Sequence, residues 1–311
     1  MSSLRLKDLS LGPRAWLRRA QTEISGVSLE MKPGEIVALT GQIQPAARHL
    51  AALLSGQNAP LGGRAEFDGV DLGRARRTNW RRLRWRIAIW RGAAEAPFSP
   101  RLPAMAGLTE QIDTLLPRLD PRLRDAQILS ALQRAGLDPD LALRQISSLT
   151  SLERVEMSLA RALVTVPEVL LAIDPIAGLD PLDRARTLNR LRALAGEGVG
   201  IMFLTEDIQA AAQIALRMGV LHAGRMVEYG MAEDIALMPR HPYTQLLLNT
   251  SADPLGGNWR HPRRPGPLPS AEPVILRPLR DPPPKLEDTP HETPPAMESD
   301  LENTGASGPE T

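Results

Sequence analysis

The chain has 311 residues, of which 42% are apolar, enough for one large or two modest domains with a substantial core. It has no cysteine, which excludes disulfides and thiolate metal sites, and its net charge of +1 excludes a general electrostatic attraction to nucleic acid. No signal-peptide core opens the sequence and no apolar run approaches the roughly 18 residues of a membrane span. We therefore expect a cytoplasmic protein whose contact with a membrane is peripheral.

Apolar runs and amphipathic segments alternate along most of the chain. The predicted strands cover residues 36–39, 87–90, 169–173, 201–204 and 218–221. The predicted helices cover residues 49–55, 121–135, 152–163, 181–194 and 208–216. This alternation favours an α/β fold with a parallel sheet and crossover helices. Residues from about 92 to 155 have helical patterns and little strand signal, which indicates an inserted helical subdomain.

The composition changes near residue 254. Of the 29 prolines, 14 lie between Pro254 and Pro309, and this region has few apolar residues and no periodicity. Such a segment cannot bury enough surface to offset the entropy of ordering it. We expect residues 1–250 to form the folded domain and residues 251–311 to be a mostly disordered tail.

The stretch GQIQPAARHL (41–50) follows a predicted strand and leads into a predicted helix, which is the context of a phosphate-binding loop. That loop requires the pattern G-x-x-x-x-G-K-[ST]. Gly41 fits, but the second glycine, the lysine and the hydroxyl residue are replaced by Ala46, Ala47 and Arg48. None of the three lysines of the chain follows a glycine, so no shifted register restores the pattern. Either the stretch is a phosphate loop that has lost its phosphate-binding residues, or it was never a phosphate loop.

A second candidate is VLLAIDPIAGLD (169–180), an apolar strand that ends in an acidic residue. Nucleotide-hydrolysing enzymes place a magnesium carboxylate at such a strand end. A core strand followed by an Asp-Pro turn explains the same letters, and the stretch alone favours that simpler interpretation.

Five stretches occur in a characteristic order: GVSLEMKPGEIVALTG (26–41), ERVEMSLARAL (153–163), PEVLLAIDPIAGLD (167–180), LHAGRMVEYG (221–230) and HPYTQLLL (241–248). Through them, residues 4–250 resemble the ATP-binding subunits of bacterial ABC importers, in particular the dipeptide, oligopeptide and nickel group. The resemblance implies a P-loop NTPase-like core with a parallel sheet, an N-terminal antiparallel β portion and an inserted helical subdomain.

The resemblance places the phosphate-loop positions at Gly41, Gln42, Gln44 and Arg48. Gln44 replaces a glycine, and Pro45 beside it removes a backbone N–H donor. Loss of the lysine removes a charged hydrogen bond, typically worth about 1.5–3 kcal/mol. Arg48 cannot ligate a cation, but its guanidinium could meet an anion at the start of the helix; a plain surface arginine is the alternative.

Pro175 and Asp180 fix the alignment at the strand end. The magnesium carboxylate position is then Ile173, and the general-base position is Asp174, whose side chain is one methylene shorter than glutamate. A base must reach its water within hydrogen-bond distance, so the shorter side chain weakens catalysis. These substitutions argue against magnesium binding and leave open whether ATP binds. Asp180, in the loop that crosses the family's dimer interface, is retained.

The remaining family positions are also altered. Residues 147–151 read SSLTS where the family has L-S-G-G-Q, so Ser148 survives but both glycines are lost. The Q-loop glutamine position holds Arg91, and the switch-histidine position holds Glu206, a carboxylate that would repel a triphosphate.

Residues 74–91 contain eight arginines interleaved with Trp80, Trp85 and Trp90. Arginine with aromatic residues is typical of nucleic-acid binding. An arginine-rich helix that leads into a core strand explains the pattern more simply, and we favour it, with no nucleic-acid partner. The resemblance places this segment beside the surface where family members receive the coupling helix of the membrane subunit.

Two hypotheses follow. The favoured one is a catalytically impaired nucleotide-binding subunit of a peptide-type importer, peripheral on the inner face of the cell membrane. It would pair with a second, intact ATPase subunit on two membrane permeases. The alternative is a scaffold or regulator that kept the ABC fold and left transport.

Overall fold

The computed structural model describes residues 3–13, 22–92, 101, 103–251 and 274–275. The strands in these ranges are β1 (Leu4–Leu11), β2 (Ile24–Met31), β3 (Ile36–Gly41), β4 (Gly62–Phe67), β5 (Val70–Asp71), β6 (Ile87–Trp90), β7 (Val169–Ile173), β8 (Gly200–Leu204), β9 (Arg217–His222), β10 (Arg225–Met231) and β11 (Val274–Ile275).

The helices lie between and after these strands. They are α1 (Gln44–Leu54), α2 (Arg77–Leu83), α3 (Ala104–Leu115), α4 (Pro121–Ala135), α5 (Ser151–Leu163), α6 (Pro181–Gly196), α7 (Ile208–Ile214), α8 (Ala232–Leu237) and α9 (Pro242–Ser251), with short 3-10 turns η1 (Pro139–Leu143) and η2 (Ile146–Ser148). Over the described ranges, no helix has the length and apolar character needed to cross a membrane.

The strands join in one sheet with the order β5-β4-β1-β2-β10-β9-β3-β8-β7-β6, and β11 pairs with β10. Strands β9, β3, β8, β7 and β6 run parallel to one another. Strand β1 pairs antiparallel with β2 and β4, and β4 pairs antiparallel with β5. This topology confirms the predicted α/β class with a parallel core and an N-terminal antiparallel portion, and α3 and α4 are inserted between β6 and β7.

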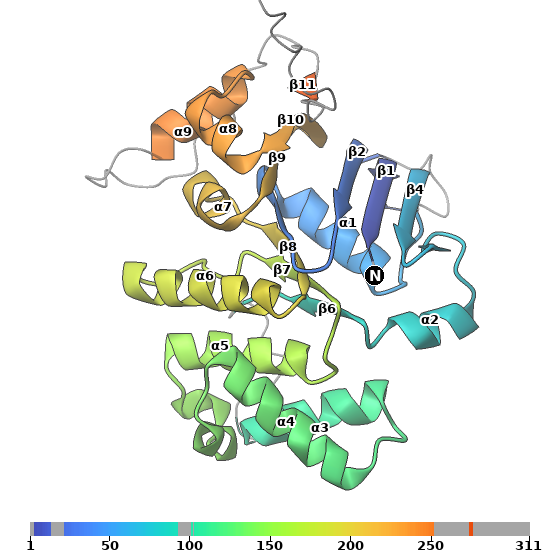
Figure 1. The fold of residues 1–311 in the computed structure, drawn as a ribbon, viewed down its shortest axis with the longest axis vertical. Coiled ribbons are helices and arrows are strands. Elements are labelled where there is room, and N and C mark those ends of the chain that lie inside the picture. The colour runs from blue at the N-terminus through green and yellow to red at the C-terminus, as the bar shows by residue number, and fades with distance from the viewer. Residues whose placement is uncertain (1–2, 14–21, 93–100, 102, 252–273, 276–311) are drawn as a thin grey trace, which may run out of the picture. The chain divides into compact units, whose positions relative to one another are not determined.

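The parallel strands are buried on both faces. Alternate side chains of β3 enter two different hydrophobic clusters, as expected for a sheet covered on each side. Ile36 and Ala38 pack in a cluster with residues of α5, α6 and α7. Val37 and Leu39 pack in the other, with α1 and strands β1, β2 and β4. Figure 1 shows α6 and α7 on one side of the parallel strands and α1 with the antiparallel strands on the other.

The core elements agree with the sequence prediction. Strands 87–90 and 169–173 and helix 121–135 have the predicted bounds. Among the elements with a predicted range, the largest difference is in α1, which begins at Gln44 instead of at residue 49. The sequence patterns gave no range for β1, β2, β4, β5, β10, α2, α8 and α9. Residues 93–100, 102, 252–273 and 276–311 lie outside the described residues, so the boundaries predicted for the helical subdomain and for the tail stay predictions.

A buried hydrogen-bond group joins β6 to α5. The indole Nε1 of Trp90 donates to Ser158 Oγ at 2.8 Å, and Ser158 Oγ also lies 2.9 Å from the carbonyl oxygen of Gly92. Trp90 is 2% exposed and Ser158 8% exposed. Because buried polar groups are normally hydrogen-bonded, the contact fixes the end of β6 on α5.

Replacing Ser158 with alanine should destabilise the fold, since the indole N–H would stay buried without an acceptor. We expect a loss of about 1–3 kcal/mol in the free energy of unfolding, measured by urea titration. The matched control is Ser130→Ala at an exposed position of α4, expected to stay within about 0.5 kcal/mol. Equal unfolding curves for Ser158→Ala and the control would contradict the assignment.

Glu156 on α5 makes the stability depend on pH. Burial raises its pKa to about 7 from an ordinary value of 4.5, although Arg190 and Arg186 oppose the shift. Between these two values the folded protein holds a proton that the unfolded chain releases. The stability contributed by this proton is complete below pH 4.5 and is lost as the pH rises through about 7.

Replacing Glu156 with glutamine removes the ionisation. We expect the variant to melt at a higher temperature than the unmodified protein at about pH 8 and to show little gain at about pH 4.5. Thermal unfolding followed by circular dichroism measures both. Glu233→Gln, at an exposed position of α8, should show no such gain. A gain for Glu156→Gln that is the same at both pH values would disprove the explanation.

Candidate functional site

Four parallel strands end along one edge of the sheet, in the spatial order β3, β8, β7, β6. Gly41 is the last residue of β3, and Glu206, Asp174 and Arg91 lie just after β8, β7 and β6. Ligands of parallel α/β sheets bind outside the carboxyl ends of the strands. Most of the residues predicted from the motifs are therefore assembled at the edge where a ligand site is expected.

The turn after β3 is built on Gly41. Its φ of 89° is in the left-handed region, and an added Cβ would lie 2.4 Å from the carbonyl oxygen of Leu221, so only glycine fits. Gln42 is held to the next strand pair, since its N–H donates to Leu221 O and its Oε1 accepts from Ala223 N, both at 2.9 Å. The Gln42 side chain thus supports the β9–β10 turn.

Helix α1 begins three residues before Ala47, which stands at the lysine position. Pro45 occupies the first helical turn, where its missing N–H costs little, and the alanines that follow are strong helix formers. Ala47 N donates to Ile43 O at 2.8 Å. Ala46 and Ala47 are 1% and 4% exposed. The backbone that would cradle a phosphate in the family motif is therefore wound into helix, and the lysine position lies in the core.

Arg48, at the hydroxyl position of the motif, forms an ion pair with Glu23, just before β2. The neighbouring His49 places Nε2 3.0 Å from the same carboxylate. The hydrogen bond from His49, followed by that from Arg48, lowers the pKa of Glu23. The anion that binds Arg48 is thus the Glu23 side chain of this protein. The motif does not predict this partner.

Gln44 and Glu206 connect two loops of the site. Gln44 Nε2 donates to Glu206 Oε1 at 3.2 Å. Gln44 stands where the family has a glycine and Glu206 where it has the switch histidine. Their hydrogen bond joins the start of α1 to the end of β8 across the position where the motifs would hold phosphate.

Asp174, at the general-base position, is half-buried. Its backbone N–H donates to Leu204 O at 2.7 Å, and its φ of 44° is uncommon outside glycine. Its Oδ1 accepts from Thr205 Oγ1 at 3.3 Å. Burial, followed by the charge of Glu206, raises the pKa of Asp174, whereas Thr205 and Arg184 oppose the rise.

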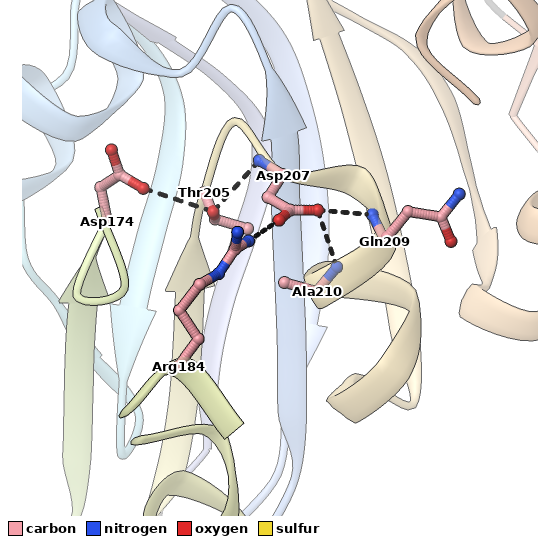
Figure 2. Close-up of polar contacts among 6 residues, drawn as sticks. All are labelled: Asp174, Arg184, Thr205, Asp207, Gln209 and Ala210. Atoms are coloured by element: carbon pink, nitrogen blue, oxygen red, sulfur yellow. Dashed lines mark hydrogen bonds and ion pairs between the residues drawn. The ribbon is translucent and has the colours of Figure 1, made fainter. Parts of the chain in front are cut away.

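Figure 2 shows a polar network that the motifs did not reveal. Asp207 caps α7, because its Oδ1 accepts from Gln209 N and Ala210 N at 3.0 Å, and its other oxygen accepts from Arg184 of α6. Asp207 N in turn donates to Thr205 Oγ1 at 3.2 Å. An acidic residue directly before a predicted helix is a capping signal that sequence analysis could have used.

The signature and interface positions lie at helix starts instead of strand ends. Ser148 is exposed and donates to Gln145 O at 2.8 Å. Thr150 and Glu153 form a reciprocal capping box at the start of α5, at 3.2 and 2.7 Å. A carboxylate of the chain therefore already bonds the N–H that a phosphate would approach. Asp180 is exposed and caps α6 through Asp183 N at 2.9 Å.

The side chains at the family's magnesium-binding positions lack the chemistry needed to hold magnesium–ATP. Ile173, at the magnesium carboxylate position, is an apolar side chain with 8% exposure. Arg48, at the hydroxyl position, carries a positive charge that is bonded to Glu23. No group of three or more His, Cys, Asp or Glu side chains arranged to hold a metal occurs in the described part of the chain.

The chain is similar to curated ATP-binding proteins of peptide transporters. It is 31% identical over 237 residues to a putative peptide import ATP-binding protein of Brucella ovis, covering 74% of this chain and 73% of the relative. It is 28% identical over 262 residues to the dipeptide transport ATP-binding protein DppF of Lactococcus lactis, covering 83% of this chain and 84% of the relative. Against the probable peptide ABC transporter ATP-binding protein y4tS of Sinorhizobium fredii it is 28% identical and spans 65% of that protein's length.

Solved structures share the fold. The cbiO1 structure from Clostridium perfringens, described as part of the ABC transporter complex cbiONQ, matches with a TM-score of 0.65 at 21% identity, over 76% of this chain and 90% of that one. The dimeric ATP-binding cassette MJ0796 bound to ADP and Pi matches with a TM-score of 0.62 at 19% identity, over 74% of this chain and 99% of that one. No family model matches the chain. On the sequence identity and coverage of its relatives, the chain belongs to the family of peptide ABC transporter ATP-binding proteins.

Proposed function

We propose that this chain is a nucleotide-binding-domain subunit of a peptide-type ABC transporter that has lost most or all of its own ATP hydrolysis. It pairs with a second, intact ATPase subunit, and both bind two membrane permease subunits on the cytoplasmic side of the cell membrane. The names of the relatives, which describe peptide import and ATP binding, support the transport role.

The observation that carries the impairment is the first turn of α1. A phosphate loop needs free backbone N–H groups and a lysine that reaches the phosphates. Here Pro45 has no N–H, the N–H of Ala47 is bonded within the helix, and the lysine position is a buried alanine. The charge–charge and hydrogen-bond contacts that hold the triphosphate in this family have no counterpart at these positions.

The end of β7 supports the same conclusion. Phosphoryl transfer depends on a metal ion that neutralises the developing charge. With Ile173 at the magnesium position, no carboxylate there binds the ion. Burial, followed by the charge of Glu206, raises the pKa of Asp174, and the Glu206 carboxylate would also repel a triphosphate. We infer that magnesium is not held in the family's manner and that ATP binds weakly or not at all.

Features that dock the domain are kept. Asp180, in the loop that crosses the family's dimer interface, is exposed and caps α6, and Ile176 and Leu188 on either side of it in the chain are buried in the core. In this family each composite site joins the phosphate loop of one subunit to the signature of the other. Because this chain has altered versions of both parts, neither composite site of the pair is complete, and hydrolysis depends on the phosphate loop and general base of the intact partner.

The purified chain should release phosphate from magnesium–ATP at the background rate, because its phosphate-loop and magnesium positions lack the required groups. A coupled phosphate-release assay measures this. The variant Asp174→Asn should give the same rate, as should the matched control Asp125→Asn at an exposed position of α4. A turnover rate that falls for Asp174→Asn and not for Asp125→Asn would show that the site is active.

Affinity purification of the full chain from native membranes should recover two permeases and a second ABC ATPase with intact motifs. Mass spectrometry of the recovered proteins identifies them. Recovery of a soluble set of partners without permeases would instead favour the alternative role, a scaffold or regulator that kept the ABC fold.

A further inference from the structure

Strand β10 is paired along one side only by the strands of the main sheet. Strand β9 pairs with it from Arg225 to Met231. On the opposite side, the pairing with β2 in the described residues is confined to Arg225 and Ser25. We call the side of residues 226–231 that faces away from β9 the β10 edge. Residues 226–230 are buried, and buried backbone N–H and C=O groups need hydrogen-bond partners, so this edge requires a further strand.

Side chains of β10 hold this edge in a fixed position. Glu228 is 0% exposed, and its two carboxylate oxygens accept hydrogen bonds from Arg240 N at 2.9 Å and His241 N at 3.2 Å. On the next residue, the ring centroid of Tyr229 lies 5.9 Å from Cζ of Arg217 on β9. These contacts tie β10 to the loop before α9 and to β9. The β10 edge is therefore preorganised to receive a strand.

Strand β11 lies on part of this edge. It pairs parallel with β10, and the register joins Val274 to Glu228 and Ile275 to Tyr229. Figure 1 shows β11 next to β10, although more than 40 residues separate them in the chain. Val274 and Ile275 are the residues after Ser251 that the structure describes. The described contact between the C-terminal region and the sheet is thus a backbone pairing with β10.

The sequence around β11 suits a short edge strand. Residues 274–276, Val-Ile-Leu, are the longest run of large apolar residues after Ser251. Valine and isoleucine favour extended backbone. Pro273 precedes the run and Pro278 follows it closely. Proline cannot donate to a ladder and is confined to edge strands and strand ends, so the strand has little room to lengthen and offers little free edge to a further strand.

The length of chain before β11 favours pairing within one molecule. A strand of two or three residues forms few backbone hydrogen bonds, so a free peptide of that length would bind weakly. Residues 252–273 connect α9 to β11. A tether of about 20 residues keeps its end at an effective concentration in the millimolar range when it can span the two sites. A second copy of the chain at micromolar concentration competes at a disadvantage of about a thousandfold.

We propose that residues 274–276 close the β10 edge of their own chain as a parallel strand, with Leu276 continuing the register beside Gly230. The occupant is this apolar segment of the C-terminal region, and the surface is the β10 edge from Glu228 to Gly230. An edge closed in this way is not available for pairing with a strand of another protein. The inference involves no nucleotide and no permease, so it is independent of the proposed function.

Hydrogen exchange of the full chain tests the pairing without changing β10. The double variant Val274→Pro/Ile275→Pro removes two N–H donors from the added strand. The β10 amides that face away from β9 should then exchange at least about tenfold faster, measured by mass spectrometry with fragmentation to single residues. The control Leu301→Pro/Glu302→Pro makes the same kind of change further along the chain and should stay within about twofold. Equal exchange in the unmodified chain and the Val274→Pro/Ile275→Pro variant, or an equal increase in the control, would overturn the proposal.

Disulfide trapping identifies the occupant, because the chain has no cysteine of its own. On mild oxidation, Tyr229→Cys/Ile275→Cys should form a disulfide within one chain, in at least about tenfold higher yield than the control pair Tyr229→Cys/Leu286→Cys. Non-reducing gels and peptide mass spectrometry measure the yields. A disulfide between two chains would assign the edge to a second copy and overturn the proposal, as would equal yields for the two pairs. Melting temperatures test the folding of these variants, and hydrogen exchange decides the question if Tyr229→Cys unfolds the chain.

Discussion

The burial of the parallel strands on both faces is the constraint on which the rest of the structure depends. Because β3, β7 and β8 are covered by helices on one side and by α1 and the antiparallel strands on the other, all their residues are buried and nearly all are apolar, whichever way they point. This packing fixes where each strand ends. The turns that follow are therefore held in place whether or not a ligand binds there, and they can change chemistry without loss of the fold.

The changed positions are satisfied from within the protein. Arg48 is bonded to Glu23, Gln44 to Glu206, and the N–H of Thr150, the residue that caps α5, to Glu153. In each case a protein side chain forms a hydrogen bond or ion pair near a position that a nucleotide occupies in the family. Buried or partly buried polar groups are costly without partners. A site satisfied in this way suits a subunit that is stable with no nucleotide bound, which is the role proposed for it.

Much of the fold was predictable because it depends on local patterns. Apolar runs located β6 and β7, and an amphipathic pattern located α4. The start of α1 was missed because a phosphate-loop context suggested a loop, whereas Pro45 and two alanines favour helix. The bond of Trp90 to Ser158 and the ion pair of Arg184 with Asp207 join residues far apart in the chain, and no spacing rule indicates them. The family resemblance indicated the site positions, whereas the contacts of those residues follow from the three-dimensional packing.

The central claim is that this chain keeps the framework of its family and has lost the ATP chemistry. The most direct test is the ATPase rate of the complete transporter, purified with its partner subunit and permeases, with one residue changed at a time. The account predicts that Asp174→Asn in this chain leaves the rate unchanged, whereas loss of the general base in the partner abolishes it. A rate that falls by about half or more with Asp174→Asn would contradict the account, since the altered site would then be hydrolysing ATP.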